Sequence, residues 1–219
     1  MISNFDEINE LFKEINNSVS DKINIYVIGG AMLLYHGLKP ATKDIDVIVF
    51  EKSEYTLFGN ALTKIGFEPK VLTNEYKHLN LNEILVRDDF RVDLFHKIVC
   101  KGFSLTDTMI SRAEPIIELS KLKVFLCSNE DVFLFKTLTE REGDLEDCIA
   151  ISRRGLNWNE ILTELKLQID ISKRNVWITY VGERLDILEE RGMIIPIMKE
   201  IDKLRTEYYE KLEKKFISS

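Results

Sequence analysis

The sequence predicts a mixed α/β protein, in which a small twisted sheet flanked by helices is followed by an all-helical C-terminal half. Two observations predict this class. Up to about residue 127, short apolar runs of strand length alternate with amphipathic helical segments. From residue 128 onward the chain shows helix-capping residues, helical periodicity and charged outer faces. We therefore expect two domains, residues 1–127 and 128–219.

The first predicted elements lead to a glycine turn. A helix from Ser3 to about Asn17 is predicted by a capping serine and a stripe of apolar residues. The apolar run 26–28 predicts a short strand that is buried on both faces. It stops at Gly29-Gly30, where the backbone can bend sharply, and a helix over 31–36 follows.

The chain then alternates between strands and helices up to the expected boundary. A basic turn precedes a strand over 47–50, and a helix over 53–66 follows it. The remaining elements expected before residue 128 are strands at 67–73, 83–87, 90–98, 115–119 and 123–126, a polar loop at 74–82 and a short helix at 105–113. Beyond it we expect helices that begin near 129, 144 and 157, with three or more helices within 158–216.

Two carboxylates stand at the entrance of the second strand. Asp44 and Asp46 lie two residues apart, so their side chains share one face of the strand, at about 3.3 Å rise per residue. Two such carboxylates repel each other unless a cation lies between them, and hard divalent ions such as Mg²⁺ or Mn²⁺ prefer oxygen ligands. Backbone amides at a glycine bend suit phosphate. Together the two features indicate metal-assisted chemistry on a nucleoside triphosphate.

A third acid lies in a later apolar strand. Asp93 is flanked by Val92 and Leu94, and burying its carboxylate without a partner would cost several kcal/mol. Period-two alternation places Arg91 on the same face. We expect Asp93 to complete the set of metal ligands with Asp44 and Asp46.

Bulk properties exclude several classes. A net charge of -7 argues against a protein that wraps extended nucleic acid. Three widely spaced cysteines without a C-x-x-C pattern argue against a disulfide framework or a zinc site, and favour a reducing cytoplasm. No apolar run approaches the roughly 18 residues of a membrane span. We expect a soluble cytoplasmic protein.

The stretch from Gly29 to Asp46, written GG-A-(x)5-G-L-K-(x)2-T-K-D-I-D, resembles the signature of the polymerase-β-like nucleotidyltransferase superfamily. Within it, the stretch is most similar to the small stand-alone branch that includes the AbiEii-type toxin nucleotidyltransferases. The resemblance implies the nucleotidyltransferase fold, with the active site in the cleft between the two halves. It also implies that Asp44, Asp46 and Asp93 bind Mg²⁺ or Mn²⁺ and are catalytic, Asp93 helping to deprotonate the acceptor.

A second motif follows about ninety residues later. The spacing K-x4-R-x2-D-x2-D, from Lys136 to Asp147, resembles the second conserved motif of the AbiEii-like enzymes. It implies that Lys136 neutralises the phosphates of the nucleotide and that Asp144 is required at the site. The other residues that we expect to bind the nucleotide are Gly29, Gly30, Lys39 and Thr42.

Two positions differ from the superfamily pattern. Many relatives carry a serine where this chain has Gly30, so that only backbone amides are available there. Many relatives also carry an arginine where this chain has Pro40; Lys39 keeps a positive charge nearby without the two-pronged grip of arginine.

Structural alternatives stand beside these assignments. Asp44 and Asp46 also fit a solvated pair at a strand edge, and Asp93 also fits a structural acid paired with Arg91 or Arg87. Asp88 and Asp89 compete for the third ligand position, although a hairpin turn explains them. The second motif also fits a set of salt bridges between helices without chemistry.

The sequence thus predicts an enzyme that transfers a nucleoside monophosphate from an NTP to an acceptor hydroxyl and releases pyrophosphate. By resemblance, the acceptor is a tRNA 3′ end first, a protein hydroxyl second and an aminoglycoside-like molecule third, and a cognate antitoxin is a further expected partner. The alternative from another class is a catalytically degenerate protein that binds nucleotide or a partner and regulates it.

Overall fold

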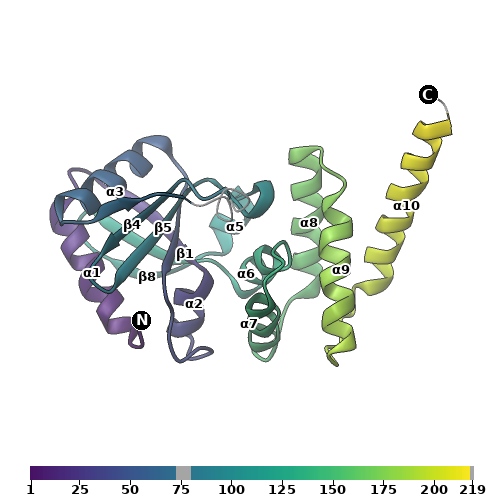
Figure 1. Ribbon diagram of the computed structural model, residues 1–219, viewed down its shortest axis with the longest axis horizontal. Helices are drawn as coiled ribbons and strands as arrows, with labels where there is room; N and C mark the ends of the chain where they lie inside the picture. The colour runs from purple at the N-terminus through teal and green to yellow at the C-terminus, as the bar shows by residue number, and fades with distance from the viewer. Residues whose placement is uncertain (73–79, 218–219) are drawn as a thin grey trace. The chain divides into compact units, whose positions relative to one another are not determined.

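The computed structural model describes residues 1–72 and 80–217, and the chain divides into two compact units, Met1–Ser128 and Asn129–Ser219. The described residues of the first unit form a seven-stranded sheet with helices around it. Those of the second unit form helices and their connections (Figure 1). The structure confirms the expected mixed α/β class with a helical C-terminal half.

The elements of the first unit follow the predicted alternation. Its α-helices are α1 (Phe5–Ser18), α2 (Gly29–Tyr35), α3 (Lys52–Lys64) and α5 (Asp107–Arg112), and η1 (Cys100–Gly102) is a 3₁₀ turn. Its strands are β1 (Ile23–Ile28), β2 (Ile45–Val49), β3 (Glu68–Lys70), β4 (Glu83–Arg87), β5 (Phe90–His96), β6 (Ile98–Val99), β7 (Phe103–Ser104), β8 (Glu114–Glu118) and β9 (Leu122–Leu126).

The sheet is mixed, and its central strands carry the predicted site. Its order is β3-β4-β5-β2-β1-β9-β8. β2 runs parallel to β5 and β1 runs parallel to β9, whereas the other neighbours are antiparallel. Because β1, β2 and β5 are neighbours, the glycine turn after β1 and the acids of β2 and β5 belong to one region of the sheet.

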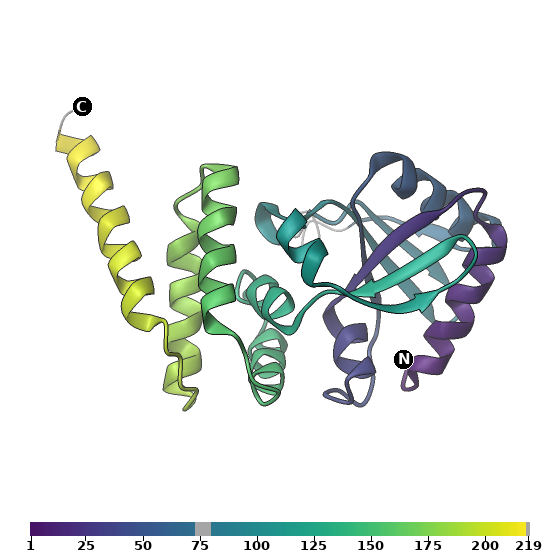
Figure 2. The same cartoon turned by 180° about the vertical axis from the view of Figure 1, so that it is seen from behind.

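The two faces of the sheet differ in chemistry. One face carries Val47 and Leu94, both fully buried, and α3 packs so closely that a Cβ on Gly59 would lie 4.0 Å from Leu94 Cδ2. α1 contacts α3 and β9, and Figure 2 shows β8 and β9 passing in front of α1. Alternation along the strands places Asp46 and Asp93 on the opposite face. The helices therefore pack on the apolar face of the sheet, and Asp46 and Asp93 lie on its other face.

Three local predictions are corrected by the structure. Asn4, not Ser3, caps α1, because its side chain accepts from the Asp6 N–H while the Glu7 carboxylate accepts from the Asn4 N–H. β5 ends two residues early, because Lys97 adopts a φ of 60° and turns the chain into the small β6–β7 ribbon. The strand expected at 67–73 is the short β3, and most of the loop expected at 74–82 lies outside the described residues.

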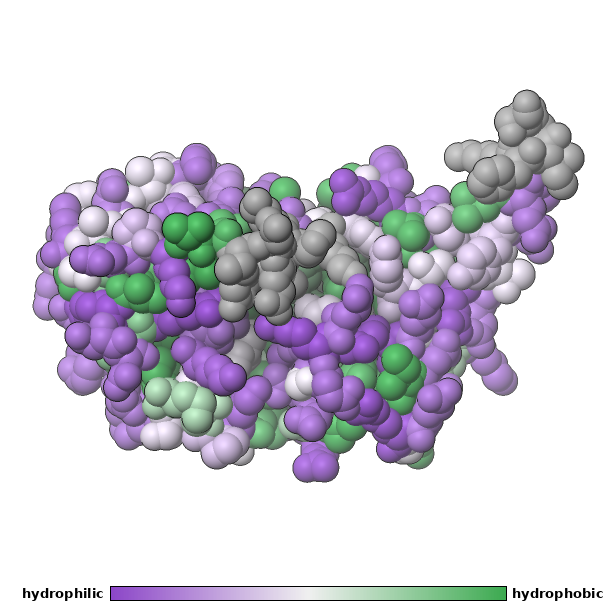
Figure 3. Space-filling model, in the orientation of Figure 1, coloured by the Kyte–Doolittle hydropathy of each residue, from purple (hydrophilic) through white to green (hydrophobic). Residues whose placement is uncertain are grey.

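The second unit is a set of helices with its own buried core. The helices are α6 (Asn129–Lys136), α7 (Glu142–Ser152), α8 (Trp158–Ser172), α9 (Trp177–Glu190) and α10 (Met198–Ile217). α9 packs against α7, α8 and α10, and its Trp177 is 2% exposed. None of the helices in the described residues is both long and apolar enough to cross a membrane. On the face that Figure 3 shows, apolar residues form small patches among polar ones.

Candidate active site

The turn after β1 is closed by the backbone of two glycines. Gly29 adopts a φ of +64°, a conformation that L side chains rarely take. A Cβ at Gly29 would lie 1.9 Å from Asp46 Oδ2, and a Cβ at Gly30 would lie 2.3 Å from Thr42 Oγ1. The carboxylate of Asp46 and the hydroxyl of Thr42 therefore fill the space that side chains at these two positions would need.

The acids of β2 and β5 lie side by side. The parallel register pairs Asp46 with Asp93, and their strands are neighbours at about 4.8 Å spacing. Asp44 comes one residue before β2 and shares the face of Asp46 by alternation. Asp93 is buried, at 4% exposure, whereas Asp44 and Asp46 are half-buried. The structure thus brings the three predicted acids to one face of two adjacent strands.

Asp93 is held by an arginine from its own strand. Arg91 Nε lies 2.6 Å from Asp93 Oδ1, and Arg91 Nη2 lies 2.6 Å from Oδ2. The pair is a two-pronged ion pair that is largely shielded from water, the type in which arginine binds carboxylates most strongly. Of the alternatives for Asp93, pairing with Arg91 is therefore present, while Arg87 instead pairs with Glu14 at 2.8 Å.

The three carboxylates are the type of ligand that a hard divalent cation prefers, but their arrangement fits such a cation only in part. Carboxylate oxygens are the ligands that Mg²⁺ and Mn²⁺ prefer, and no Cβ crowds the glycine turn beside Asp46. However, the Asp46 carboxylate lies against Gly29 while that of Asp93 is engaged by Arg91. Among residues 1–72 and 80–217, no group of three acidic, histidine or cysteine side chains is spaced to hold a metal ion. A metal site formed by all three acids stays a prediction.

Thr42 connects the glycine turn with the first acid. Its hydroxyl donates a 2.9 Å hydrogen bond to the Asp44 carbonyl, and its side chain is 3% exposed. Its backbone N–H and carbonyl also bond to Ile2, at 2.8 and 2.9 Å. The Thr42 hydroxyl therefore lies against Gly30 and bonds to the backbone of Asp44. Lys39 lies half-buried in the same connection.

The second motif forms a buried ionic cluster inside the helical unit. Lys136 Nζ lies 2.8 Å from Asp144 Oδ1 and 2.7 Å from Asp147 Oδ2, and Lys136 is 7% exposed. Asp144 also accepts from the Thr139 hydroxyl and from Arg141 Nε. The anionic partner that the sequence led us to expect from a triphosphate is therefore supplied by the protein, and the motif contains the interhelical salt bridges of the structural alternative.

Burial and pairing act in opposite directions on this cluster. Burial alone would lower the pKa of the Lys136 ammonium, but the charges of Asp144 and Asp147 outweigh it and raise that pKa above its ordinary value. Burial alone would raise the pKa of Asp144, but the charges of Lys136 and Arg141 outweigh it and lower the pKa to about 2. Lys136 and Asp144 therefore both stay charged at neutral pH.

The predicted site residues thus fall into two groups. Gly29, Gly30, Lys39, Thr42, Asp44, Asp46 and Asp93 belong to the first unit, and Lys136 and Asp144 belong to the second. From the sequence, the ion pair between Arg91 and Asp93 was predicted only as an alternative. The i, i+2 spacing of the two residues on one strand is what indicated it.

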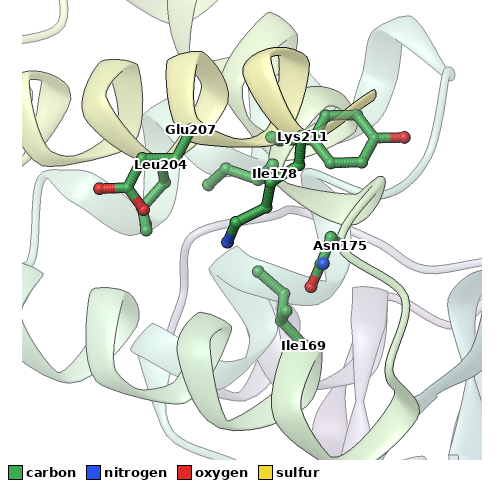
Figure 4. Close-up of a pocket in the computed structure, with 7 residues that line it drawn as sticks. Ile169, Asn175, Ile178, Leu204, Glu207 and Lys211 are labelled. Atoms are coloured by element: carbon green, nitrogen blue, oxygen red, sulfur yellow. The ribbon is translucent and has the colours of Figure 1, made fainter. Parts of the chain in front are cut away.

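The helical unit also contains a small pocket, formed by α8, the start of α9, and α10 (Figure 4). Its polar lining includes one acid and one base, Glu207 and Lys211. The other residues that line it are Ile169, Asn175, Ile178, Leu204 and Tyr208. None of the predicted site residues lines this pocket.

Comparison with known proteins adds a family to this geometry. Residues 4–174 match the family model described as "Nucleotidyltransferase of unknown function (DUF6036)". Of the solved structures, TM1012 of Thermotoga maritima, a candidate nucleotidyltransferase, is 18% identical, with a TM-score of 0.43 over 61% of this chain and 83% of that one. ANT(2″)-Ia, in complex with adenylyl-2″-tobramycin, is 10% identical, with a TM-score of 0.47 over 72% of this chain and 94% of that one. No curated protein matches the chain.

Proposed function

Because this chain belongs to the DUF6036 family of nucleotidyltransferases, we propose that it transfers a nucleoside monophosphate from an NTP to an acceptor hydroxyl and releases pyrophosphate. The observation that carries the proposal is the register of β2 and β5, which aligns Asp46 with Asp93 and brings Asp44 to the same face. The packing of the core does not require a cluster of acids on two adjacent strands. Nor does it require a glycine turn beside them that is too tight for any Cβ.

We assign roles to the residues of the first unit. Asp44 and Asp46 would hold Mg²⁺ or Mn²⁺, which when bound neutralises the charge of the triphosphate. Asp93 would orient the acceptor hydroxyl and accept its proton, and its burial keeps competing water away. The backbone of Gly29 and Gly30 would bind the phosphates.

Further contacts come from the connection between α2 and β2 and from the helical unit. Thr42 and Lys39 would contribute polar and charged contacts to the nucleotide. Lys136 and Asp144 already satisfy each other within the second unit, so we assign them the task of holding α6 against α7. Positioning and charge neutralisation would supply most of the rate, since phosphoryl chemistry asks for little covalent help from the protein.

The acceptor is proposed from the resemblance of the two motifs to the AbiEii-type branch. A tRNA 3′ end comes first, a protein hydroxyl second and an aminoglycoside-like hydroxyl third. In the first two cases a cognate antitoxin is a further proposed partner. The net charge of -7 disfavours the binding of a long stretch of nucleic acid. It does not disfavour the binding of one RNA end by a local basic contact.

A label-transfer experiment tests the proposal. The full chain is incubated with each α-³²P-labelled NTP and Mg²⁺ or Mn²⁺, in turn with total tRNA, lysate proteins and aminoglycosides. We expect label on one acceptor class, and a loss of at least about 100-fold in the Asp44→Asn/Asp46→Asn variant. Asp89→Asn is the matched control, because this acid lies exposed in the β4–β5 turn. Transfer that is equal in all three proteins would contradict the assignment.

One observation favours a second candidate function. The ion pair of Arg91 with Asp93 neutralises the third acid, as expected for a protein that binds a nucleotide or partner without transferring anything. For such a protein, equilibrium dialysis would show that the chain binds an NTP, and the label-transfer experiment would show no label on any of the three acceptor classes.

A further inference from the structure

Four charged side chains form a compact block on β2 and β5. The register pairs Ile45 with Val92 and Asp46 with Asp93, so the residues one position earlier, Asp44 and Arg91, also lie beside each other. All four share the face opposite the helices by alternation. Three carboxylates and one guanidinium leave a formal charge of -2 on this block, which is the charge that a single divalent cation neutralises.

The arginine in this block leaves little room for a second metal ion. Its Nε and Nη2 atoms contact both oxygens of Asp93, each at 2.6 Å. The side chain of Asp93 is 6% exposed and that of Arg91 is 21% exposed, so the pair is shielded from water. Breaking a buried pair to release one carboxylate leaves an uncompensated charge on each partner, which is costly. The cation that neutralises Asp93 is therefore the guanidinium of Arg91.

The orientation of the neighbouring acid agrees with this division. Asp46 Oδ2 lies where a Cβ of Gly29 would be, so its carboxylate is directed toward β1 and the glycine turn. The Asp93 carboxylate is directed along its own strand toward Arg91. Within the described part of the chain, these side chains do not converge into a three-acid metal site.

We propose that Arg91 stands in place of the second cation, so that the active site binds one divalent ion per chain, through Asp44 and Asp46. This inference rests on the proposed function and deepens it, because it defines the metal content of the same site. Arg91 is in these terms a positioning residue, which acts by holding the Asp93 carboxylate in place through two 2.6 Å contacts.

Counting bound Mn²⁺ tests the inference without measuring activity. The EPR signal of free Mn²⁺ is recorded while the full chain is titrated with Mn²⁺ alone. We expect one bound ion per chain, at least tenfold weaker binding in Asp46→Asn, and binding within twofold of wild type in Asp93→Asn. We expect Arg91→Gln to release Asp93 and raise the count to two. A count of two in the wild type, or loss of binding in Asp93→Asn, would overturn the inference.

Controls separate this inference from misfolding and from the proposed function. Arg87→Gln breaks a similar two-pronged pair with Glu14 on the neighbouring strand, and we expect it to keep a count of one. If Arg91→Gln fails to fold by circular dichroism, Arg91→Lys and Asp93→Asn decide, the lysine keeping its charge without the double grip. A wild type that binds no Mn²⁺ overturns both proposals, whereas a count of two with intact label transfer overturns only this one.

Discussion

Gly29 is a position where two independent constraints exclude any side chain. Its φ of +64° is unfavourable for L residues, and Asp46 Oδ2 occupies the place of a Cβ. Gly30 meets only one constraint, the contact with Thr42 Oγ1. The sequence showed that a bend was needed at this pair, but not which side chains lie against it, because those come from a segment more than ten residues later.

Gly29→Ala is expected to remove label transfer and to lower the free energy of unfolding by roughly 2–4 kcal/mol, since it adds both backbone strain and a clash with Asp46. Urea unfolding measures the loss. Gly143→Ala is the matched control, because that glycine lies in α7 with open space around it and should gain up to about 1 kcal/mol. Equal effects of the two substitutions would contradict this account of the turn.

Gly30→Ala is expected to be rescued in part by a second substitution. Alone it should cost about 1–3 kcal/mol, because the new Cβ would lie 2.3 Å from Thr42 Oγ1. Thr42→Ala removes that atom and leaves a milder contact with the Thr42 Cβ, at 3.2 Å. A double-mutant cycle measured by urea unfolding should therefore show favourable coupling. Simple additivity would indicate that the two residues do not share this space.

At the scale of elements, α6 and α7 are joined by charge as well as by packing. Lys136 ends α6, and its two acidic partners come from α7. The sequence showed that a lysine among Phe and Leu requires an anion. It did not show which one, because the partners lie 8 and 11 residues away in the next helix, beyond the spacing at which residues of one helix meet.

Lys136→Met is expected to cost about 3–5 kcal/mol at pH 7, because it removes the buried ammonium that Asp144 and Asp147 share, although Asp144 keeps its ion pair with Arg141. Thermal or urea unfolding measures this loss. Lys13→Met, which removes an exposed i, i+3 pair with Glu10, should change stability by less than about 1 kcal/mol. Similar losses in the two variants would show that the buried cluster is no more important than a surface pair.

The pH dependence of stability follows from the pKa of Asp144. Folding lowers that pKa from its usual 3.8 to about 2, so the stabilisation is complete above pH 4 and is lost as the pH falls from 4 toward 2. In Lys136→Met we expect a smaller loss over this range, because the charge of Lys136, the largest of the influences that lower the pKa of Asp144, is then absent. Parallel pH profiles of the wild type and this variant between pH 7 and 3 would contradict the assignment.

At the scale of the whole molecule, the fold class was readable from the alternation of strands and helices, and the family match supports the predicted reaction class. The pairing of strands was not readable, since β2 pairs with β5 across α3, β3 and β4. Short elements such as β6 and β7 were missed, because the unusual backbone of Lys97 and Cys100 has no signature in residue type. The AbiEii-type branch and the acceptor remain predictions.

Each unit carries a buried cysteine that reports on its own opening. Cys127 is buried in the first unit and Cys148 in the second, where burial raises the pKa of its thiol to about 12, whereas Cys100 is half-buried. We expect Cys100 to react first with a thiol reagent.

Lys136→Met should speed the labelling of Cys148 far more than that of Cys127, as measured by mass spectrometry of the peptides. Equal acceleration would show that the two units open together.

The parallel pairing of β2 with β5 also has a consequence for the order of folding. Asp46 and Asp93 are separated by 47 positions (93 minus 46), and a whole crossover with its own helix must be synthesised and closed before they meet. Closing so long a loop carries an entropic penalty that local contacts alone do not repay. A nascent chain is therefore expected to transfer no nucleotide until the β5 segment, which carries the proposed base Asp93, has left the ribosome, however early the glycine turn forms.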